Sequence, residues 1–373
     1  MSGFEYPKKY LEKFKKLRPI LTDGSQLQYA IKETTGMDYS KLKKFKALPL
    51  QSIRKIIDQH GNEISETLKK IAQLEADNFS LKQSQAAAFI AFGMMSFYPN
   101  GMKGTCFRKL YEIFDSCSIE KFKCFVKYLD YCANKGFPSE DLHFIKATYT
   151  DGIDFKKLNG LMNQTVIITC LKIEDSEEKD YAHVIFASKS ISGGILGGGC
   201  VQEEIYHCMS PPCIAARMFL PILTEKEALI IKNAYRYINY QGYGSSFQYT
   251  VDRSTIRSNI LIFIDALNFK GDPKKQYSEE LINREIIKFY TGISAKDIPT
   301  TIISGLWGYD EFGGNPDLKI AIQVFAASLA GKCLTISLFG QNDSMIKKVE
   351  EFLSILCMKK IEQRKFYLFI SQI

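Results

Sequence analysis

Two adjacent glutamates, Glu203 and Glu204, are the residues of this 373-residue chain whose type and spacing most suggest chemistry. They follow two glycine clusters, at 193–194 and 197–199. Successive residues of a helix point about 100° apart, so the two carboxylates cannot perform the same task. One could bind a substrate hydroxyl while the other transfers a proton. A structural alternative stays open, because acidic residues also stabilise the first turn of a helix.

The glycines indicate what such carboxylates would act on. The first glycine stretch follows a predicted strand at 181–188, and FGGN at 312–315 follows another at 300–305. Glycines after a strand let backbone N–H groups approach a phosphate closely, and ligands of α/β folds bind at such strand ends. Neither GxGxxG nor GxxxxGK[ST] occurs in these stretches, which disfavours a dinucleotide-binding Rossmann site and a P-loop. We therefore expect a phosphate-bearing ligand in loops of another type.

The elements that must position these loops are of two kinds. From about 61 to 135 the apolar spacing is helical, beginning with a helix at 64–79, and Gly136 is suited to end the last helix. After about 160, short apolar β-rich runs alternate with helical segments, which predicts an α/β fold with a mostly parallel sheet covered on both faces. The predicted strands are 165–173, 181–188, 228–233, 259–267, 300–305 and 333–340, and the helices between them 200–209, 277–292, 318–332 and 344–356.

Composition places the chain among ordinary globular proteins, with 46% hydrophobic and 24% charged residues. The longest apolar run, 86–97, is too short to cross a bilayer, and the N-terminus has no apolar signal region. We therefore expect an intracellular protein, cytoplasmic or nuclear. The ten cysteines contain no CxxC pair and only four histidines are present, so we expect free thiols and no metal site.

The net charge of +8 is concentrated at the N-terminus. Residues 1–55 contain thirteen Lys/Arg and five Asp/Glu, a balance of 13 − 5 = +8, and the remainder is neutral overall. Such a basic segment can bind an acidic protein surface, and Phe14, Leu17, Leu42 and Phe45 give it apolar residues for docking. An ordinary solvated amphipathic face is the alternative. No nucleic-acid-binding motif accompanies the charge, so we do not predict DNA binding.

Several stretches together resemble a known family, the poly(ADP-ribose) glycohydrolases. SGG at 192–194, seven further residues and then QEE at 202–204 resemble the family signature. Five longer stretches resemble other family segments in collinear order: FASKSISGG, NYQGYGSSFQY, FIDALNF, LWGYDEFGGNPDLKIAIQVFAAS and ISLFG. The resemblance covers roughly residues 61–355. It implies a macrodomain-like three-layer α/β/α catalytic domain with a mixed sheet at 151–373, an all-α accessory domain at 61–150 and a basic segment at 1–60.

The resemblance also implies an activity and the residues that perform it. The enzyme would be a glycoside hydrolase that cleaves ribose–ribose bonds of ADP-ribose polymers to ADP-ribose, without a metal or redox cofactor. Glu204 would protonate the leaving ribose oxygen and then activate water, while Glu203 and Gln202 hold the ribose. The remaining implied substrate-binding residues are Gly193, Gly194, Phe312, Gly313 and Gly314 for the diphosphate, Phe339 and Glu174 for adenine, and Phe247 where the family has a tyrosine. On this alignment residues 197–199 are a flexible spacer.

Four positions depart from the family pattern. Ile185 stands where the family has an aspartate, Ser188 and Leu306 replace asparagines, and Ser192 replaces the first glycine of the triplet. An isoleucine cannot supply the hydrogen bond of an aspartate. These departures leave an alternative to full activity, a weakened protein that binds ADP-ribose without cleaving it. The basic segment, for which the resemblance offers no counterpart, leaves another: a structural component of a larger assembly such as the cytoskeleton.

Overall fold

The structure, a computed structural model, describes residues 5–17, 21, 23–44, 50–64, 67, 77–98, 106–163, 165–176, 181–220, 222–357 and 361–373. The chain packs into two compact units, and each is treated by itself below. The first unit draws on residues 1–144, 190–222 and 231–258, and the second on 145–189, 223–230 and 259–373. Each unit is therefore built from segments that are far apart in the sequence. The segment with both glutamates, for example, belongs to the same unit as the N-terminal helices.

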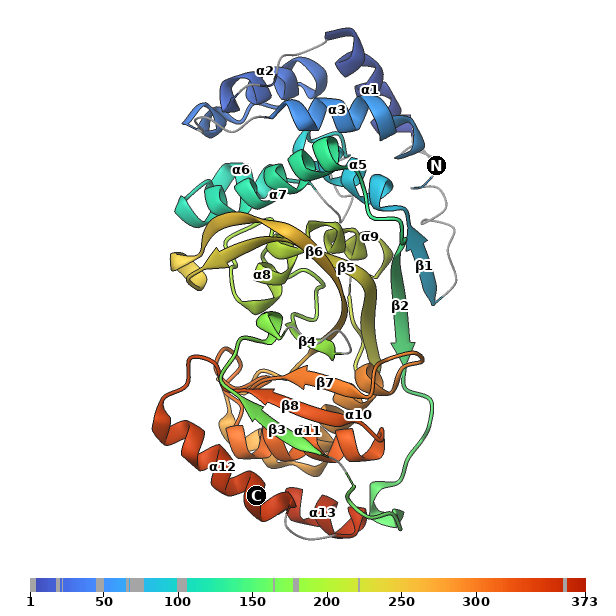
Figure 1. Cartoon of the computed structure of the whole chain (residues 1–373), viewed down its shortest axis with the longest axis vertical. Helices are drawn as coiled ribbons and strands as arrows, with labels where there is room; N and C mark the ends of the chain where they lie inside the picture. The colour runs from blue at the N-terminus through green and yellow to red at the C-terminus, as the bar shows by residue number, and fades with distance from the viewer. Residues whose placement is uncertain are drawn as a thin grey trace. The chain divides into compact units, whose positions relative to one another are not determined.

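Helices dominate the first unit (Figure 1). Helix α3 packs against α5 and α7. The helices are α1 (Glu5–Leu17), α2 (Gly24–Thr35), α3 (Gln51–His60), α5 (Gln83–Met94), α6 (Arg108–Ile113), α7 (Ser116–Lys135), α8 (Gln202–Met209) and α9 (Ala216–Phe219). Strand β1 (Asn78–Leu81) neighbours β2 (Leu142–Thr148), which in turn neighbours β5 (Glu227–Gln241), and β5 neighbours β6 (Gln248–Asp265).

The longest of these helices, α7, has clear stop and start signals in its sequence. The side chain of Asp115 caps it by accepting a hydrogen bond from the Ser118 N–H at 2.8 Å. Gly136 ends it with a φ of +85°, which confirms the predicted C-terminal glycine. Two strands, β1 and β2, lie in the segment 61–150, which is therefore not all-α as the resemblance implies. Asn78 and Phe79, the last residues of the predicted 64–79 helix, lie in β1, and most of that helix falls outside the described residues.

The apolar residues of the basic N-terminal segment pack within the chain. Phe14 is buried with its ring edge-on to Phe97, at 5.7 Å between centroids, and the guanidinium carbon of Arg54 lies 4.7 Å from its ring. Leu42 is buried as well, whereas Phe45 lies outside the described residues. Phe14 and Leu42 therefore belong to the core of the first unit and are not free to dock on a partner.

A parallel sheet forms the second unit. The strand order is β6, β4 (Tyr181–Ala187), β7 (Thr301–Ser304), β8 (Cys333–Ser337) and β3 (Val166–Thr169), and every neighbouring pair is parallel. The helices of this unit are α10 (Glu279–Ser294), α11 (Pro316–Leu329), α12 (Asp343–Cys357) and α13 (Gln363–Ile370). Figure 1 shows β7, β8 and β3 side by side with α11 across them. The α/β class and the mainly parallel sheet are confirmed.

Two predicted strands extend far beyond their apolar stretches. The stretch 228–233 is part of the fifteen-residue β5, and 259–267 overlaps the C-terminal half of the eighteen-residue β6. A six-residue turn joins these neighbouring strands into a hairpin, which makes the whole sheet mixed. Gly242 begins the turn with a φ of +75°, and a side chain there would collide with the Ser246 carbonyl oxygen. The predicted strands are shorter because polar residues, KN at 232–233 and RS at 257–258, border the apolar runs from which they were predicted.

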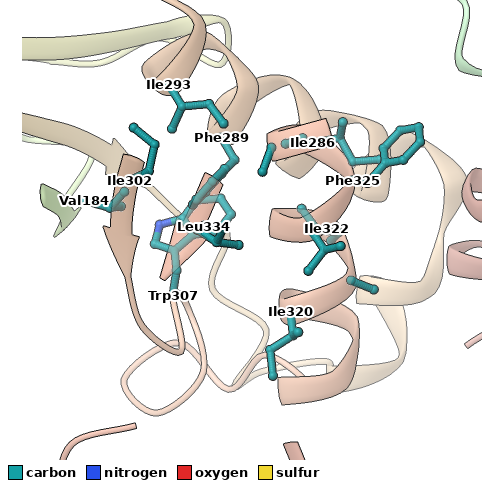
Figure 2. Close-up of a cluster of buried hydrophobic side chains, with 14 of the residues drawn as sticks. Val184, Ile286, Phe289, Ile293, Ile302, Trp307, Ile320, Ile322, Phe325 and Leu334 are labelled. Atoms are coloured by element: carbon teal, nitrogen blue, oxygen red, sulfur yellow. The ribbon is translucent and has the colours of Figure 1, made fainter. Parts of the chain in front are cut away.

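One hydrophobic cluster fills the second unit between the sheet and helices α10 and α11 (Figure 2). Trp307 and Phe289 pack at its centre with ring centroids 5.6 Å apart. The indole N–H of Trp307 donates to the Ile264 carbonyl oxygen at 3.3 Å, so its one polar atom is satisfied. Leu306, the residue that replaces a family asparagine, is buried in the same cluster.

Among the described helices, none is both long and apolar enough to cross a membrane.

Two isoleucines of the second unit offer a matched test of this core. We expect Ile322→Ala in α11, where the side chain is 1% exposed, to lower the free energy of unfolding by about 2–5 kcal/mol because it leaves a cavity. The same substitution at Ile355 in α12, which is 66% exposed, should change it by no more than about 0.5 kcal/mol. Denaturant unfolding measures both, and equal losses would contradict the described core.

Candidate active site

The two glutamates lie beside a loop that we call the glycine loop, residues 192–201, in the first unit. Tight turns shape its first half. The N–H of Ile195 donates to the Ser192 carbonyl at 3.1 Å, and that of Gly197 to the Gly194 carbonyl at 2.8 Å. Helix α8 begins directly after the loop, so Glu203 and Glu204 stand in its first turn.

Glu204 holds both halves of the glycine loop. Its carboxylate is buried, Oε1 accepts from the Gly194 N–H at 2.6 Å, and Oε2 accepts from the Val201 N–H at 2.9 Å. The bond to Val201 is half of a capping box, in which the third helical residue reaches back to the N-cap. Glu204 therefore does stabilise the first turn of α8, which is the structural alternative considered in the sequence analysis. The bond to Gly194 goes further, because it ties the carboxylate to a residue ten positions upstream.

Glu203 faces a different part of the loop. Its Oε1 accepts from the Ser192 N–H at 2.7 Å, and the side chain is also buried. Ser192 has a φ of +68°, a conformation that glycine adopts more readily. Its buried hydroxyl has no hydrogen-bond partner among the described residues. The serine that replaces the first family glycine thus keeps the glycine-like backbone at the cost of an unsatisfied hydroxyl.

Three glycines are required by close contacts around Glu204. A Cβ on Gly193 would collide with Oε1 of Glu204 and lie 2.8 Å from Oε2 of Glu203. A Cβ on Gly194 would lie 2.7 Å from Cα of Gly199. A Cβ on Gly199 would lie 2.8 Å from Oε1 of Glu204. The expectation that 197–199 is only a flexible spacer is therefore wrong for Gly199, because a side chain there would strike the Glu204 carboxylate, as one on Gly193 would.

The β5–β6 hairpin contributes a residue that the sequence analysis missed. The hydroxyl oxygen of Tyr243 accepts a hydrogen bond from the Gln202 N–H at 3.3 Å, and the Gly244 N–H donates to the Cys200 carbonyl at 2.8 Å. Tyr243 is half-exposed at the start of helix α8. The sequence could have indicated Tyr243, because it lies inside the stretch 239–249 that resembles a loop of the family.

Phe247, the ring predicted at a family tyrosine position, has a different environment. It is buried, and its ring stacks on Tyr240 with 5.6 Å between centroids. The structure therefore places the Tyr243 hydroxyl at Gln202, whereas Phe247 packs inside the hairpin.

Helix α7 presents charged and nucleophilic groups to the same loop. Lys121 is completely buried and hydrogen-bonds to loop carbonyls. One turn earlier, a hydrogen bond with Cys200 lowers the pKa of the Cys117 thiol to about 7, and the charge of Lys121 acts in the same direction. The pKa of Cys200, its partner, is raised, first by this hydrogen bond and then by burial.

The second unit contains the residues predicted to bind diphosphate. Phe312 is half-buried, and its carbonyl accepts from the Phe269 N–H at 2.7 Å. Gly313 has a φ of +66°, and the Gly314 N–H donates to the Gly308 carbonyl at 2.9 Å. A Cβ on Gly314 would lie 2.7 Å from Cε of Lys319.

Beneath this glycine pair lies an ion pair between Lys319 and Glu285, both buried. Burial lowers the pKa of Lys319 well below its ordinary range. The Lys319 ammonium also lies 4.6 Å from the Trp307 ring. The loop at 312–314 therefore rests on a buried charged group as well as on the core.

The two residues predicted to bind adenine, Phe339 and Glu174, lie in the second unit on segments that contact each other. Phe339 follows β8 and is 54% exposed, and the Lys172 ammonium lies 5.2 Å from its ring centroid. The Ser337 hydroxyl donates to the Leu171 carbonyl at 2.6 Å, joining the end of β8 to the segment before Glu174. Glu174 is half-buried in a short 3₁₀ helix, Ile173–Asp175. An aromatic ring this exposed is available for stacking.

The departures from the family pattern lie in ordered, packed positions. Ile185 is completely buried in β4, in register with Phe263 of β6. Ser188 is half-buried just after β4. An apolar side chain at 185 fits its surroundings as a core residue.

Comparison with known proteins places the chain in a class and then in a family. The parallel strands and the glycine loop before α8 belong to a protein of the macro domain fold, and the chain is a member of the poly(ADP-ribose) glycohydrolase family. The family model described as "Poly (ADP-ribose) glycohydrolase (PARG), Macro domain fold" matches residues 153–346, more than half of the chain. The resemblance of the sequence to this family is thereby confirmed.

Individual relatives are distant. The chain is 26% identical over 329 residues to poly(ADP-ribose) glycohydrolase 2 of Caenorhabditis elegans, covering 81% of this chain and 66% of the relative. It is 28% identical over 318 residues to poly(ADP-ribose) glycohydrolase 1 of the same organism, covering 78% and 38%. The chain thus spans no more than 66% of the length of either. A poly(ADP-ribose) glycohydrolase from Deinococcus radiodurans in complex with ADP-ribose aligns with a TM-score of 0.40 and 15% identity, covering 57% of this chain and 95% of that one.

Adjacent glycines allow a matched test of the loop. We expect Gly199→Ala to speed amide hydrogen exchange across 192–204, because its Cβ would displace the Glu204 carboxylate that binds the Gly194 and Val201 N–H groups. Gly198→Ala is the control, since a Cβ there meets nothing within 4 Å. Mass-spectrometric exchange measures both variants. Equal exchange in the two would contradict the packing of Gly199 against Glu204.

Proposed function

We propose that this chain is a poly(ADP-ribose) glycohydrolase, which hydrolyses the ribose–ribose glycosidic bonds of ADP-ribose polymers and releases ADP-ribose. One observation carries the proposal: the Glu204 carboxylate is buried against the glycine loop, held by the N–H groups of Gly194 and Val201. Membership of the family and the names of the Caenorhabditis elegans relatives support it.

In the proposed reaction Glu204 is the single general acid and base. Its protonated carboxyl gives a proton to the ribose oxygen as the glycosidic bond breaks, and positive charge develops on the ring that keeps the anomeric carbon. The resulting carboxylate then takes a proton from the water that attacks this carbon, which restores the acid. Hydrogen bonds to both carboxylate oxygens fix the side chain in one orientation, so little positional freedom is lost when substrate binds.

The remaining predicted residues have supporting roles in the proposal. Glu203 and Gln202 hold the ribose, and Tyr243, which lies at the Gln202 N–H, joins them. The backbone of Gly193 and Gly194 is assigned to the diphosphate, because both positions exclude a side chain. In the second unit the proposed contacts are Phe312, Gly313 and Gly314 with diphosphate, and Phe339 and Glu174 with adenine; for Phe247 the proposed contribution is packing of the hairpin.

Partner and location are further parts of the proposal. We retain an intracellular location, cytoplasmic or nuclear, which agrees with the free thiols of the nine cysteines whose side chains the structure describes. We also retain binding of an acidic protein surface by the lysines of residues 1–55, among which Lys9, Lys13, Lys16 and Lys43 are exposed.

The sharpest test of the proposed function is Glu204→Gln. The amide cannot donate and accept the catalytic proton, so release of ADP-ribose from polymer should fall by about 10²–10⁴-fold. Binding of ADP-ribose, measured by calorimetry, should fall far less than its release, because the side chain keeps its size and the amide oxygen still accepts from one of the two N–H groups. Glu350→Gln, at an exposed position of α12, controls for the substitution itself. A wild type and a Glu204→Gln variant that release ADP-ribose equally, or not at all, would refute the hydrolase proposal.

A second candidate function is binding of ADP-ribose without turnover. The observation that favours it is Ile185, a buried apolar residue where the resemblance implies an aspartate that supports catalysis. Calorimetric binding of ADP-ribose by a wild type that releases no product from polymer would establish this function in place of the first.

Restoring the aspartate shows whether Ile185 limits the rate. We expect Ile185→Asp to raise the rate of ADP-ribose release by about tenfold, since errors of position near a reacting centre are costly. A buried carboxylate lowers stability, so the assay requires a temperature at which thermal unfolding shows the variant folded. Ile185→Val, which stays apolar, should match the wild type. A folded Ile185→Asp variant that is no faster than wild type would contradict this interpretation.

A further inference from the structure

Lys121 of helix α7 reaches the glycine loop from the helical part of the first unit. Its side chain is 0% exposed. The ammonium donates to the carbonyl oxygens of Gly197 and Gly199, each at 2.6 Å, and of Gly194 at 3.3 Å. An ammonium has three N–H donors, so the three carbonyls match its full hydrogen-bonding capacity.

Burying the charged ammonium of a lysine costs free energy, because the group loses its hydration. A buried ammonium is tolerated only when hydrogen bonds or opposite charges replace water. Two other completely buried lysines, Lys288 and Lys319, each lie beside a carboxylate, Asp265 at 2.8 Å for the former and Glu285 for the latter. Lys288 also donates to the backbone carbonyls of Thr224 and Glu227. The hydrogen bonds of Lys121 go to three carbonyls of a single loop, so the ammonium holds the orientation of those peptide groups.

The consequence follows from the planarity of the peptide group. Fixing a carbonyl oxygen also fixes the N–H of the next residue, which points the opposite way. Two consecutive peptide groups are held at Gly194: Lys121 binds the carbonyl of the 194–195 peptide, and Glu204 binds the N–H of the 193–194 peptide. Gly199 is similar: its carbonyl accepts from Lys121, and its Cα lies where any side chain would strike Glu204.

We infer that Lys121 is a positioning residue, which fixes the peptides of the glycine loop and, through Gly194 and Gly199, the carboxylate of Glu204. The geometry holds whether or not the chain is a hydrolase, but its kinetic consequence rests on the proposed function. Removing the ammonium takes the 2.6 Å donor from the carbonyls of Gly197 and Gly199, whereas the Gly194 carbonyl keeps the N–H of Gly197, and the loop relaxes to satisfy the two that lose it. A displacement of about 1 Å at Glu204 is enough for a loss of about a hundredfold in rate.

The kinetic test compares Lys121→Met with Lys121→Arg. Met keeps the length but not the donors, and kcat for ADP-ribose release should fall by about 10–100-fold. Arg keeps the charge and the donors and should recover most of that loss, which a purely space-filling role does not predict. Lys332→Met is the control, because Lys332 also donates to backbone carbonyls, those of Ile298 and Pro299, in the second unit. A folded Lys121→Met variant with kcat close to that of the control overturns the inference.

A second measurement keeps the inference independent of the proposed function. Amide hydrogen exchange across 192–204 should be faster in Lys121→Met than in wild type, while α10 and α11 exchange as before. If the wild type releases no ADP-ribose, the hydrolase proposal fails, and exchange alone decides the role of Lys121. If Lys121→Met does not fold, Lys121→Gln, which retains two donors, takes its place. Unchanged exchange in the folded variant overturns the inference.

Discussion

The hydrogen bonds that Glu204 accepts from Gly194 and Val201 are the constraint on which the glycine loop depends. A single carboxylate joins the beginning and end of the loop to the first turn of α8. The three glycines at 193, 194 and 199 are necessary because the carboxylate and the opposite strand of the loop leave no room for a Cβ. The same bonds give the side chain the fixed orientation that a general acid requires.

Charges of opposite sign act on the two kinds of backbone group in this loop. Glu203 and Glu204 accept from N–H groups, while Lys121 donates to carbonyls. Charge-assisted hydrogen bonds are stronger than neutral ones, so together they offset the conformational freedom of a loop with five glycines. The loop is therefore ordered by side chains from α7 and α8, and its glycines provide space for that order.

The sequence predicts part of this arrangement well. Apolar strands such as 181–188 and the glycine end of α7 follow from local chemistry, and the family signature identifies Glu203 and Glu204. The role of Gly199 did not follow, because a spacing pattern contains no information on which backbone atoms approach a carboxylate. The role of Lys121 could not be predicted for a related reason. A lysine in an amphipathic helix is expected to face solvent, and only the tertiary structure places this one against carbonyls more than seventy residues away in the sequence. Likewise, no local signal shows that 190–222 packs with the N-terminal helices.

The most direct measurement is a crystal structure of the wild-type chain with ADP-ribose. The account predicts ligand at the glycine loop, with the Glu204 carboxylate at the anomeric carbon end of the ribose and still hydrogen-bonded to the N–H groups of Gly194 and Val201. A structure in which ADP-ribose binds away from this loop, or in which Glu204 has left both N–H groups and points away from the ribose, would contradict the account.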